Sequence, residues 1–205
     1  MSTAEERKQR RRDEILDAAQ RIFVAKGYTA AGIADIATEL GIGHGTFYRY
    51  FKNKHDIATA VLDRVIERLA AAGLVEDPES SNTLDEYRDQ VRRILTRLVK
   101  LTAEHPRLLT FFHEQGLVID RGRLDRFREM FAAFTARFLV NGIDKGFLRS
   151  DLDVEPTSGA LVALIFEGAT RALTSADPQT GRRWMDAGMT LMFEGIANPD
   201  QVSTP

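Results

Sequence analysis

Residues 33–54 read IADIATELGIGHGTFYRYFKNK and decide the fold of the N-terminal part of this chain. Their apolar spacing predicts two short helices, 33–40 and about 44–50, joined by three residues. Helices this short bury their apolar faces only by packing against each other and against a third helix. Ala37 is small enough for a close helix crossing, and Gly41 suits a sharp turn with a positive φ. The pattern is typical of a helix-turn-helix, whose second helix enters the major groove of DNA.

The second helix of this pair carries side chains that can bind DNA. A histidine and an arginine can hydrogen-bond base edges or phosphates, two hydroxyl groups can reach the backbone, and a glycine permits close approach. Lys54 falls at the start of the next helix, where its ammonium and the exposed N–H groups can together hold one phosphate. The candidate contacts within the second helix are His44, Gly45, Thr46, Tyr48 and Arg49.

The remaining sequence predicts helices almost throughout. Apolar residues recur at the three- and four-residue spacing of helices, and we find neither a run of alternating strands nor an internal repeat. The sequence therefore predicts an all-α fold of about nine helices, with an N-terminal three-helix module and a C-terminal helical bundle. The other expected helices are one around Ile15–Phe23 that stops at Gly27, one from Lys54 to about Ala72, one from Leu84 to before Pro106, one from Pro106, one over about Arg121–Lys145, one over about Val154–Ser175, and one from Asp177-Pro178 to near Asn198-Pro199.

We expect three regions along the chain. Residues 1–10 form a basic N-terminal arm, and residues 11–72 form a DNA-binding domain whose helix-turn-helix covers about 33–51. Residues 73–205 form a domain for effector binding and dimerisation. The best candidate for a linker is 76–83 (EDPESSNT), which combines a proline with serine and asparagine.

The charge of the chain is unevenly distributed. Its 205 residues carry a net charge of −2, which by itself argues against a nucleic-acid binder. Residues 1–54, however, hold ten Lys and Arg against seven Asp and Glu, and the remainder holds 18 against 23. A basic end and an acidic body suit a protein that meets a polyanion at one end, although a basic tail in solvent would look the same.

Several classes of protein are excluded by composition. The chain has no cysteine, which rules out disulfides, thiolate metal sites and a cysteine nucleophile. The four histidines (His44, His55, His105 and His113) lack the spacing of metal ligands, and no nucleotide-loop or nucleophile pattern occurs. No apolar stretch approaches the roughly 20 residues that span a bilayer. We therefore expect a cytoplasmic protein that is not an enzyme, binds no cofactor or metal, and has no membrane partner.

The stretch GYTAAGIADIATELGIGHGTFYRYFKNKHDI, residues 27–57, resembles the DNA-binding signature of the TetR family of transcriptional regulators. The resemblance extends from about Arg11 to Ala71, and GIDKGFLRSDLD at 142–153 resembles a lead-in to the dimerising helices of that family. It implies that His44 and Gly45 face bases. It further implies contacts to the DNA backbone or to flanking bases from Thr46, Tyr48, Arg49, Tyr50 and Lys54, with added charge from Arg10, Arg11 and Arg12.

Two departures from the family pattern affect the expected contacts. Gly32 and Gly43 stand at the helix starts, where the family usually has threonine or serine, so a hydroxyl contact to phosphate is lost. Ala34 stands where some members have a polar residue that reads a base. We expect Ala34 to contact a thymine methyl group at most, and His44 and its neighbours to carry more of the base reading.

The last two helices are the candidates for a dimer interface. A single helix-turn-helix is too small to read a useful site, so such proteins usually bind two half-sites as dimers. The resemblance implies that this helix pair forms a four-helix bundle with its partner; an internal core without a partner is the alternative. The candidate interface residues are Leu161, Leu164, Ile165, Gly168, Ala172, Trp184, Met185, Gly188, Leu191 and Met192.

A group of phenylalanines lies between the two ends of the chain. Its periodicity favours ordinary core packing, whereas the resemblance implies a small-molecule pocket in this region. The candidate pocket residues are Phe111, Phe112, His113, Phe127, Phe131, Phe134, Phe138, Glu167 and Arg171, with Glu114 as a further polar group. Glu167 and Arg171 are spaced four apart and can equally form an ion pair within one helix.

These features predict a ligand-responsive, dimeric, sequence-specific transcriptional regulator. The resemblance implies a repressor that binds a palindromic double-stranded DNA operator and is released by a small apolar or aromatic effector. The alternatives are a dimeric helical interaction protein and a regulator without a small-molecule switch.

Overall fold

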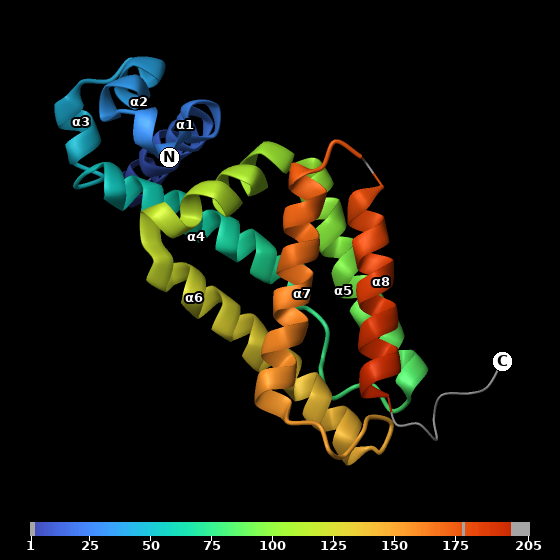
Figure 1. Ribbon diagram of the computed structural model, residues 1–205. Coiled ribbons are helices and arrows are strands. Elements are labelled where there is room, and N and C mark those ends of the chain that lie inside the picture. The colour runs from blue at the N-terminus through green and yellow to red at the C-terminus, as the bar shows by residue number, and fades with distance from the viewer. Residues whose placement is uncertain (1–2, 178, 198–205) are drawn as a thin grey trace. The chain divides into compact units, whose positions relative to one another are not determined.

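The computed structural model describes residues 3–177 and 179–197 and consists of helices and connecting loops (Figure 1). Within these residues the regular structure is eight α-helices, and the pairing of extended backbone is limited to one antiparallel bridge between Leu148 and Ala197. The all-α prediction is confirmed. The helices are α1 (Ala4–Ala30), α2 (Ile33–Leu40), α3 (His44–Tyr48), α4 (Lys54–Gly73), α5 (Leu84–Glu104), α6 (Pro106–Asp144), α7 (Val154–Thr174) and α8 (Thr180–Ile196).

Two of these helices are interrupted. Gly27, at φ 76°, breaks α1 three residues before its end, as expected for a glycine with positive φ. Asp120, at φ −157°, breaks α6 into two segments, which is where the sequence predicts one helix ending and the next beginning. Counting the two α6 segments separately gives the nine helices that the sequence predicts. Pro178 and Asn198, the predicted limits of the last helix, lie outside the described residues.

The contacts divide the chain into two compact units. The N-terminal unit comprises residues 1–67 together with 107–121, and the C-terminal unit comprises 68–106 and 122–205. The sequence analysis expected a boundary at residue 72, whereas this division falls inside α4, after Glu67.

The N-terminal unit has its own apolar core. Phe23 of α1 is fully buried and stacks on Phe111 of the first α6 segment, with ring centroids 6.0 Å apart and planes within 4° of each other. This contact explains why 107–121 joins the N-terminal unit. Other core residues come from α1, α2, α3, the loop after α3, and α4: Ile15, Leu16, Ala18, Ala19, Ile36, Ala37, Phe47, Phe51, Ile57, Ala58, Val61, Leu62 and Val65.

The C-terminal unit packs around Tyr87, which is fully buried and lies within 5.8 Å of Phe138 and 5.4 Å of Phe193, measured between ring centroids. The same core contains Leu84, Leu139, Phe147, Leu148, Ile196 and Ala197. Helices α7 and α8 run antiparallel beside each other in this unit (Figure 1).

The predicted linker at 76–83 is a fastened loop of the C-terminal unit. Asn141 donates a hydrogen bond to the carbonyl of Ser81 at 2.9 Å, and Gln90 donates one to the carbonyl of Asp77 at 2.9 Å. Lys145 donates to the carbonyls of Glu79 and Ser81 at 2.9 and 2.8 Å. Polar side chains from later parts of the sequence therefore satisfy the backbone of this loop.

Candidate nucleic-acid interface

The turn between α2 and α3 is built as the sequence predicts. Gly41 ends α2 in the left-handed conformation at φ 62°, ψ 34°, and Gly32 and Gly43 precede α2 and α3 with extended backbone. Neither glycine has a side chain to cap its helix, but the carboxylate of Asp35 accepts a hydrogen bond from the Gly32 N–H at 2.8 Å. Asp35 therefore supplies one half of a capping box, while the half that the side chain of a serine or threonine at position 32 would supply is missing.

Helix α3 is shorter than expected. It ends at Tyr48 instead of residue 50, with Arg49 as its C-cap. Its end is nevertheless hydrogen-bonded, because the N–H groups of Tyr50 and Phe51 both donate to the carbonyl of Phe47, at 2.9 and 3.1 Å. The chain thus turns tightly after Tyr48 and leads into α4.

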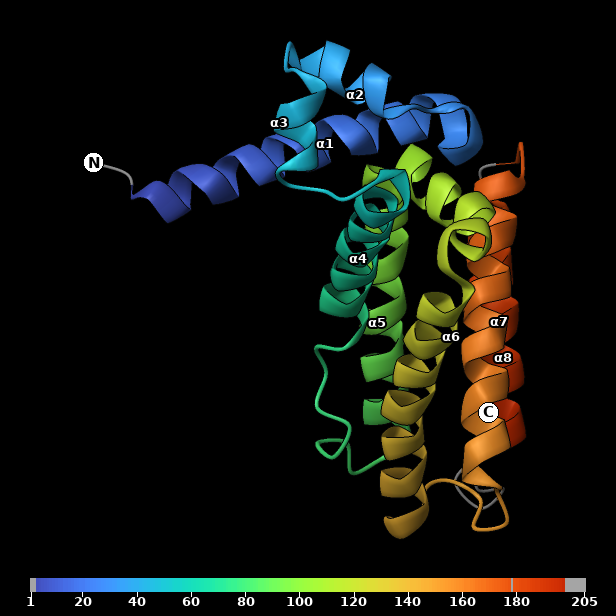
Figure 2. The same ribbon diagram turned by 90° about the vertical axis from the view of Figure 1, so that its left-hand side faces the viewer.

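Helix α3 has one buried and one exposed side. Phe47 is 0% exposed and packs against Phe51, with ring centroids 6.0 Å apart, while the neighbouring Tyr48 is 53% exposed. His44 and Gly45 are exposed too, and a Cβ placed at Gly45 would meet nothing within 4 Å. The exposed side of α3 therefore includes His44 and Gly45, which the sequence predicts to face bases. Figure 2 shows α3 beside α2 and α1.

The remaining candidate contacts around α3 differ in accessibility. Ala34 and Arg49 are exposed, whereas Thr46 and Tyr50 are half-buried. The guanidinium of Arg49 reaches the hydroxyl of Thr46 at 3.5 Å, so the two polar groups lie side by side at the surface.

Lys54 has contacts within the protein. Its ammonium donates to the carbonyl of Thr29 at 3.0 Å and lies 4.7 Å from the centre of the Tyr28 ring. Both partners follow the break at Gly27, so Lys54 ties the start of α4 to the end of α1. A phosphate contact from Lys54 would have to share the ammonium with these groups.

The three arginines of the N-terminal segment have different surroundings. Arg12 lies over the buried Phe51 ring, 4.9 Å from its centroid, and is half-buried. Arg11 is exposed and pairs with Glu14 at 2.7 Å, and Arg10 is exposed. Arg12 thus packs against the helix-turn-helix, while Arg10 and Arg11 lie at the surface.

Ion pairs fix the α1 and α2 helices to each other. Lys26 pairs with Asp35 at 2.7 Å, and Arg21 pairs with Glu39 at 2.6 Å. The hydrogen bond from Lys26, followed by that from the Gly32 N–H, holds the pKa of Asp35 below its usual value. Exposed pairs of this kind each contribute about 0–1 kcal/mol, so they orient the helices more than they stabilise them.

Ion pairs also join α4 to α1. The guanidinium of Arg64 binds Asp13 at 3.1 Å and also binds Asp17. Together with the Lys54 contacts, it fixes the first part of α4 to the helix that supports α2 and α3.

The comparison with known proteins agrees with this geometry. Residues 15–61 match the profile of the family described as bacterial regulatory proteins, tetR family. The HTH-type transcriptional regulator TtgR of Pseudomonas putida is 27% identical over 199 residues, which cover 91% of this chain and 93% of that protein. The chain is therefore similar to TetR-family regulators along most of its length, and its helix-turn-helix region matches the family profile.

Solved structures of TetR regulators share the fold. A TetR transcription regulator from Haloarcula marismortui ATCC 43049 aligns with a TM-score of 0.75 at 22% identity, over 93% of this chain and 100% of that one. The transcriptional regulator FadR from Bacillus subtilis in complex with stearoyl-CoA aligns with a TM-score of 0.67 at 22% identity, over 89% and 98%.

The predicted pocket residues fall into both units. Phe111, Phe112 and His113 belong to the N-terminal unit, where Phe111 is part of the core and His113 is exposed. Phe134 and Phe138 pack on the core around Tyr87 in the C-terminal unit. The predicted set is therefore divided between the two units.

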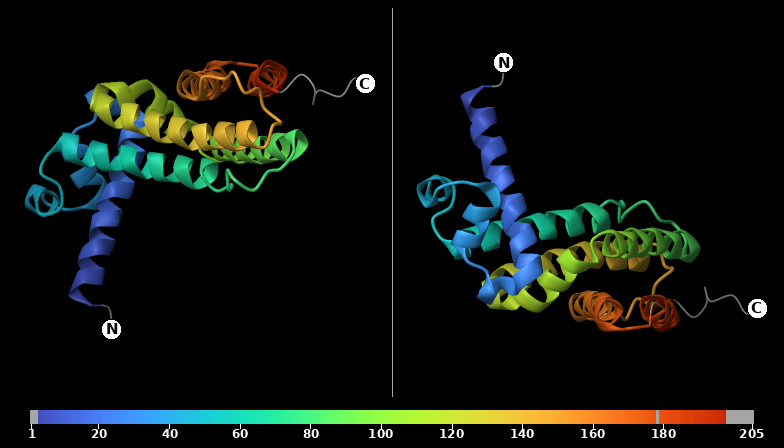
Figure 3. Two further views of the ribbon diagram at one scale, coloured as in Figure 1. Left: turned by 90° about the horizontal axis from the view of Figure 1, so that it is seen from below. Right: turned by 90° about the horizontal axis from the view of Figure 1, so that it is seen from above.

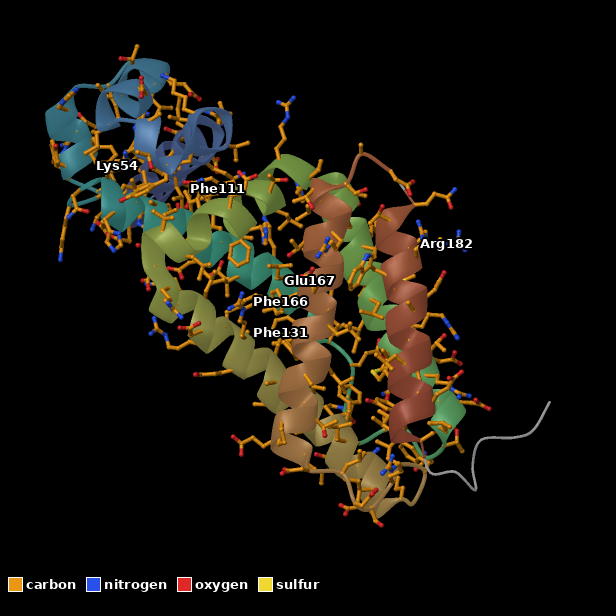
Figure 4. All side chains as sticks on the ribbon, in the orientation of Figure 1. Lys54, Phe111, Phe131, Phe166, Glu167 and Arg182 are labelled. Atoms are coloured by element: carbon orange, nitrogen blue, oxygen red, sulfur yellow. The ribbon has the colours of Figure 1, made fainter. Side chains whose placement is uncertain are left out.

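A smaller aromatic cluster remains in the C-terminal unit. Phe127 and Phe131 meet edge to face at 4.9 Å, and Phe166 of α7 lies 5.6 Å from Phe127 and 6.4 Å from Phe131, between ring centroids (Figure 4). We call these three rings the Phe166 cluster. Phe166 is not among the predicted pocket residues, because in the sequence it is only one of several apolar residues in its helix.

The polar candidates beside this cluster are paired. Glu167 and Arg171 form the ion pair that their spacing predicts, at 2.6 Å, and Arg171 lies 5.6 Å from the Trp184 ring centroid. Glu114 is exposed in the N-terminal unit.

Several predicted dimer residues hold α7 and α8 together. A Cβ at Gly188 would meet Leu164 at 3.3 Å, and one at Gly168 would meet Trp184 at 3.6 Å. Gly181, which the sequence analysis did not single out, faces Ala172. Leu161 and Met192 pack on the core around Tyr87, and Ile165 and Met185 are half-buried. Leu191 is different, because it is 67% exposed.

The described part of the chain offers neither a metal site nor a membrane-spanning helix. Among residues 3–177 and 179–197, no three His, Asp or Glu side chains gather in a way that could hold a metal ion. Within the same residues, no helix combines the length and the apolar character needed to cross a bilayer.

Proposed function

We propose that this TetR regulator binds a palindromic operator as a homodimer, represses transcription, and is released by a small apolar or aromatic effector. The observation that carries the DNA-binding part is the two-sided α3, on which Phe47 is fully buried while His44, Gly45 and Tyr48 are exposed. Because the buried side of α3 packs on the protein core, its exposed side can enter a major groove while that packing stays intact.

The proposed contacts follow from exposure. His44 reads a base edge, Gly45 allows the backbone to approach, and Ala34 contacts a thymine methyl group. Tyr48 and Arg49 bind phosphates, and Thr46 and Tyr50 contribute hydroxyl groups at the edge of the same surface. No catalytic role is proposed for any residue.

Replacement of Tyr48 by alanine is expected to weaken DNA binding about tenfold to hundredfold, because a hydrogen bond to a charged group contributes about 1.5–3 kcal/mol. The measurement is a titration of DNA from upstream of the regulator's own gene, at fixed salt, with an unrelated duplex for comparison. Val118→Ala, which truncates another exposed side chain of the N-terminal unit, is the matched control. If the Tyr48→Ala protein bound DNA as tightly as the wild type, the proposal that α3 forms the DNA interface would be wrong.

Dimerisation through α7 and α8 is supported by the surface that this pair leaves uncovered. The small residues between the two helices allow them to pack closely, and Leu191 remains 67% exposed on α8. A large exposed apolar side chain on such a pair suits a partner helix pair related by two-fold symmetry.

The effector part of the proposal rests on the Phe166 cluster and on the end of α4. A Cβ at Gly73, the last residue of α4, would lie 2.7 Å from the Phe131 ring, so that ring packs directly on the helix end. An effector that displaces Phe131 would therefore move the end of α4. Because α4 continues into the N-terminal unit, where Lys54 and Arg64 fix it to α1, such a movement can change the position of α3.

An effector that binds at the Phe166 cluster is expected to lower DNA affinity about 5- to 150-fold, the usual range of allosteric coupling. The probes are aromatic compounds and stearoyl-CoA, the ligand of FadR from Bacillus subtilis, with binding measured by calorimetry and DNA affinity by titration. Phe166→Ala is expected to abolish the response, while the exposed Val140→Ala serves as the control. Probes that bind but leave DNA affinity unchanged would favour a regulator without a switch.

A further inference from the structure

Within the described residues of the C-terminal unit, three arginines lie over aromatic rings. Two of them, Arg88 and Arg171, lie 5.4 and 5.6 Å from the centroids of their rings. Each of these two also has a carboxylate partner in its own helix, Asp85 at 3.2 Å from Arg88 and Glu167 at 2.6 Å from Arg171. A guanidinium that lies over a ring uses its face for this contact and still presents N–H groups from its edge. In both cases a carboxylate accepts from that edge.

The third arginine, Arg128, has the aromatic contact but lacks the carboxylate. Its guanidinium lies 5.6 Å from the centroid of the Phe166 ring. It forms no ion pair with a carboxylate of residues 3–177 and 179–197, although Asp125 precedes it by three residues. The side chain of Arg128 is exposed, so its N–H edge is accessible to an anion from solution.

Arg128 lies at the edge of the Phe166 cluster. Phe127 and Phe131 of the same helix are buried, whereas Phe166 is half-buried and keeps part of its ring accessible. The second segment of α6 and α7, which carry these three rings, lie side by side in Figures 2 and 3. Glu167, the residue after Phe166, is already in an ion pair of its own at 2.6 Å. A cation without an anion therefore adjoins an accessible aromatic surface.

We propose that the effector of this protein is an apolar or aromatic carboxylate, whose anionic group binds Arg128 while its apolar part lies against the Phe166 cluster. This inference rests on the proposed function and names the chemical class of the ligand. A planar carboxylate accepts two parallel hydrogen bonds from the edge of a guanidinium, so the ring contact of Arg128 can persist. The apolar part of the ligand shields this ion pair from water, which strengthens the attraction.

The test compares two acids with their neutral amides. The probes are naphthoate with naphthamide and decanoate with decanamide, because the two members of each pair share a carbon skeleton and differ in charge at neutral pH. Calorimetric titration of the full chain at low salt is expected to show each acid binding about fivefold tighter than its amide, or more. The preference is expected to shrink at about 1 M salt, which screens an accessible ion pair.

Variants of Arg128 locate the preference. Arg128→Gln keeps a good helix former at an exposed position and is expected to bind each acid no better than its amide, with the affinity for the amides unchanged. Arg128→Lys keeps the charge but loses the two-pronged geometry, so it is expected to retain only part of the preference. The matched control is Arg126→Gln, which removes the same charge from an exposed position about 200° away around the helix and is expected to bind the acids like the wild type.

The outcomes separate this inference from the proposed function. Equal affinities of acid and amide in the wild type, or an acid affinity that Arg128→Gln leaves unchanged, would overturn the carboxylate class alone, provided that Phe166→Ala weakens the binding of both members of a pair. Acids that bind Phe166→Ala as tightly as the wild type would overturn the Phe166 cluster as the effector site, and the carboxylate class at that site with it. A wild type that binds neither acid would also overturn the inference. Circular dichroism confirms that each variant is folded.

Discussion

The variant Phe47→Ala is expected to lower the free energy of unfolding of the N-terminal unit by about 3–5 kcal/mol and to abolish selective DNA binding. Truncation of a buried phenylalanine removes its apolar burial and leaves a cavity, which together cost this much. Phe47 is 0% exposed and touches the rings of both Tyr48 and Phe51. Because whole domains are stable by only about 5–15 kcal/mol, the loss is a large part of the total.

Urea denaturation followed by circular dichroism measures this effect, and DNA titration at the same temperature measures binding. The control is the adjacent residue. Tyr48→Ala is expected to change the unfolding free energy by no more than about 0.5 kcal/mol, because Tyr48 is 53% exposed, and yet to weaken DNA binding. If Phe47→Ala were as stable as the wild type, the packing of Phe47 in the core would not stabilise α3. The division of this helix into a buried and an exposed side would then be wrong.

The second large effect is expected in the C-terminal unit, from the addition of a single methyl group. A Cβ at Gly142 would lie 2.5 Å from Leu148 and 2.7 Å from the Phe147 ring, both of them buried core residues. Gly142→Ala is therefore expected to destabilise this unit by about 1–3 kcal/mol, since overpacking forces neighbouring side chains and backbone to move. The measurement is the midpoint of urea denaturation, with the fluorescence of Trp184 as a probe in the same unit.

Gly159→Ala is the matched control for this substitution. Gly159 lies inside α7, is exposed, and would place its new Cβ in open space. Alanine is a better helix former than glycine, so a gain of about 0.5–1 kcal/mol is expected. Equal effects of the two substitutions would mean that the turn carrying Phe147 and Leu148 can shift at no cost, and that the core around Tyr87 is looser than its burial indicates.

The candidate contacts on α3 were predictable because their signals are local. Helical spacing identified α2 and α3, and the glycine at position 41 indicated the left-handed turn that the structure has at φ 62°. The polar residues and the glycine of the second helix then marked the candidate contacts, of which His44, Gly45 and Tyr48 are exposed. The same reasoning found the Glu167–Arg171 ion pair, which depends only on spacing within one helix.

Other features depended on residues that are distant in sequence. Nothing near Phe111 indicates that it stacks on Phe23, and nothing near Lys54 indicates that its ammonium reaches Thr29 and Tyr28. Arg128 lies in a segment rich in arginine, and its position over the Phe166 ring had no signal in the sequence. The hydrogen bonds of the loop at 76–83 were not predictable either, because their donors, Asn141 and Lys145, come from another part of the chain.

The sequence by itself therefore determined the all-α fold class, where the helix-turn-helix lies, and which family the chain resembles. Helical period and the conformational freedom of glycine act over a few residues, so they can be read directly from the chain. The tertiary structure alone decided which side chains are used for packing and which remain available to DNA. Burial and charge pairing are set by the whole fold, because the atoms that surround a residue come mostly from other segments.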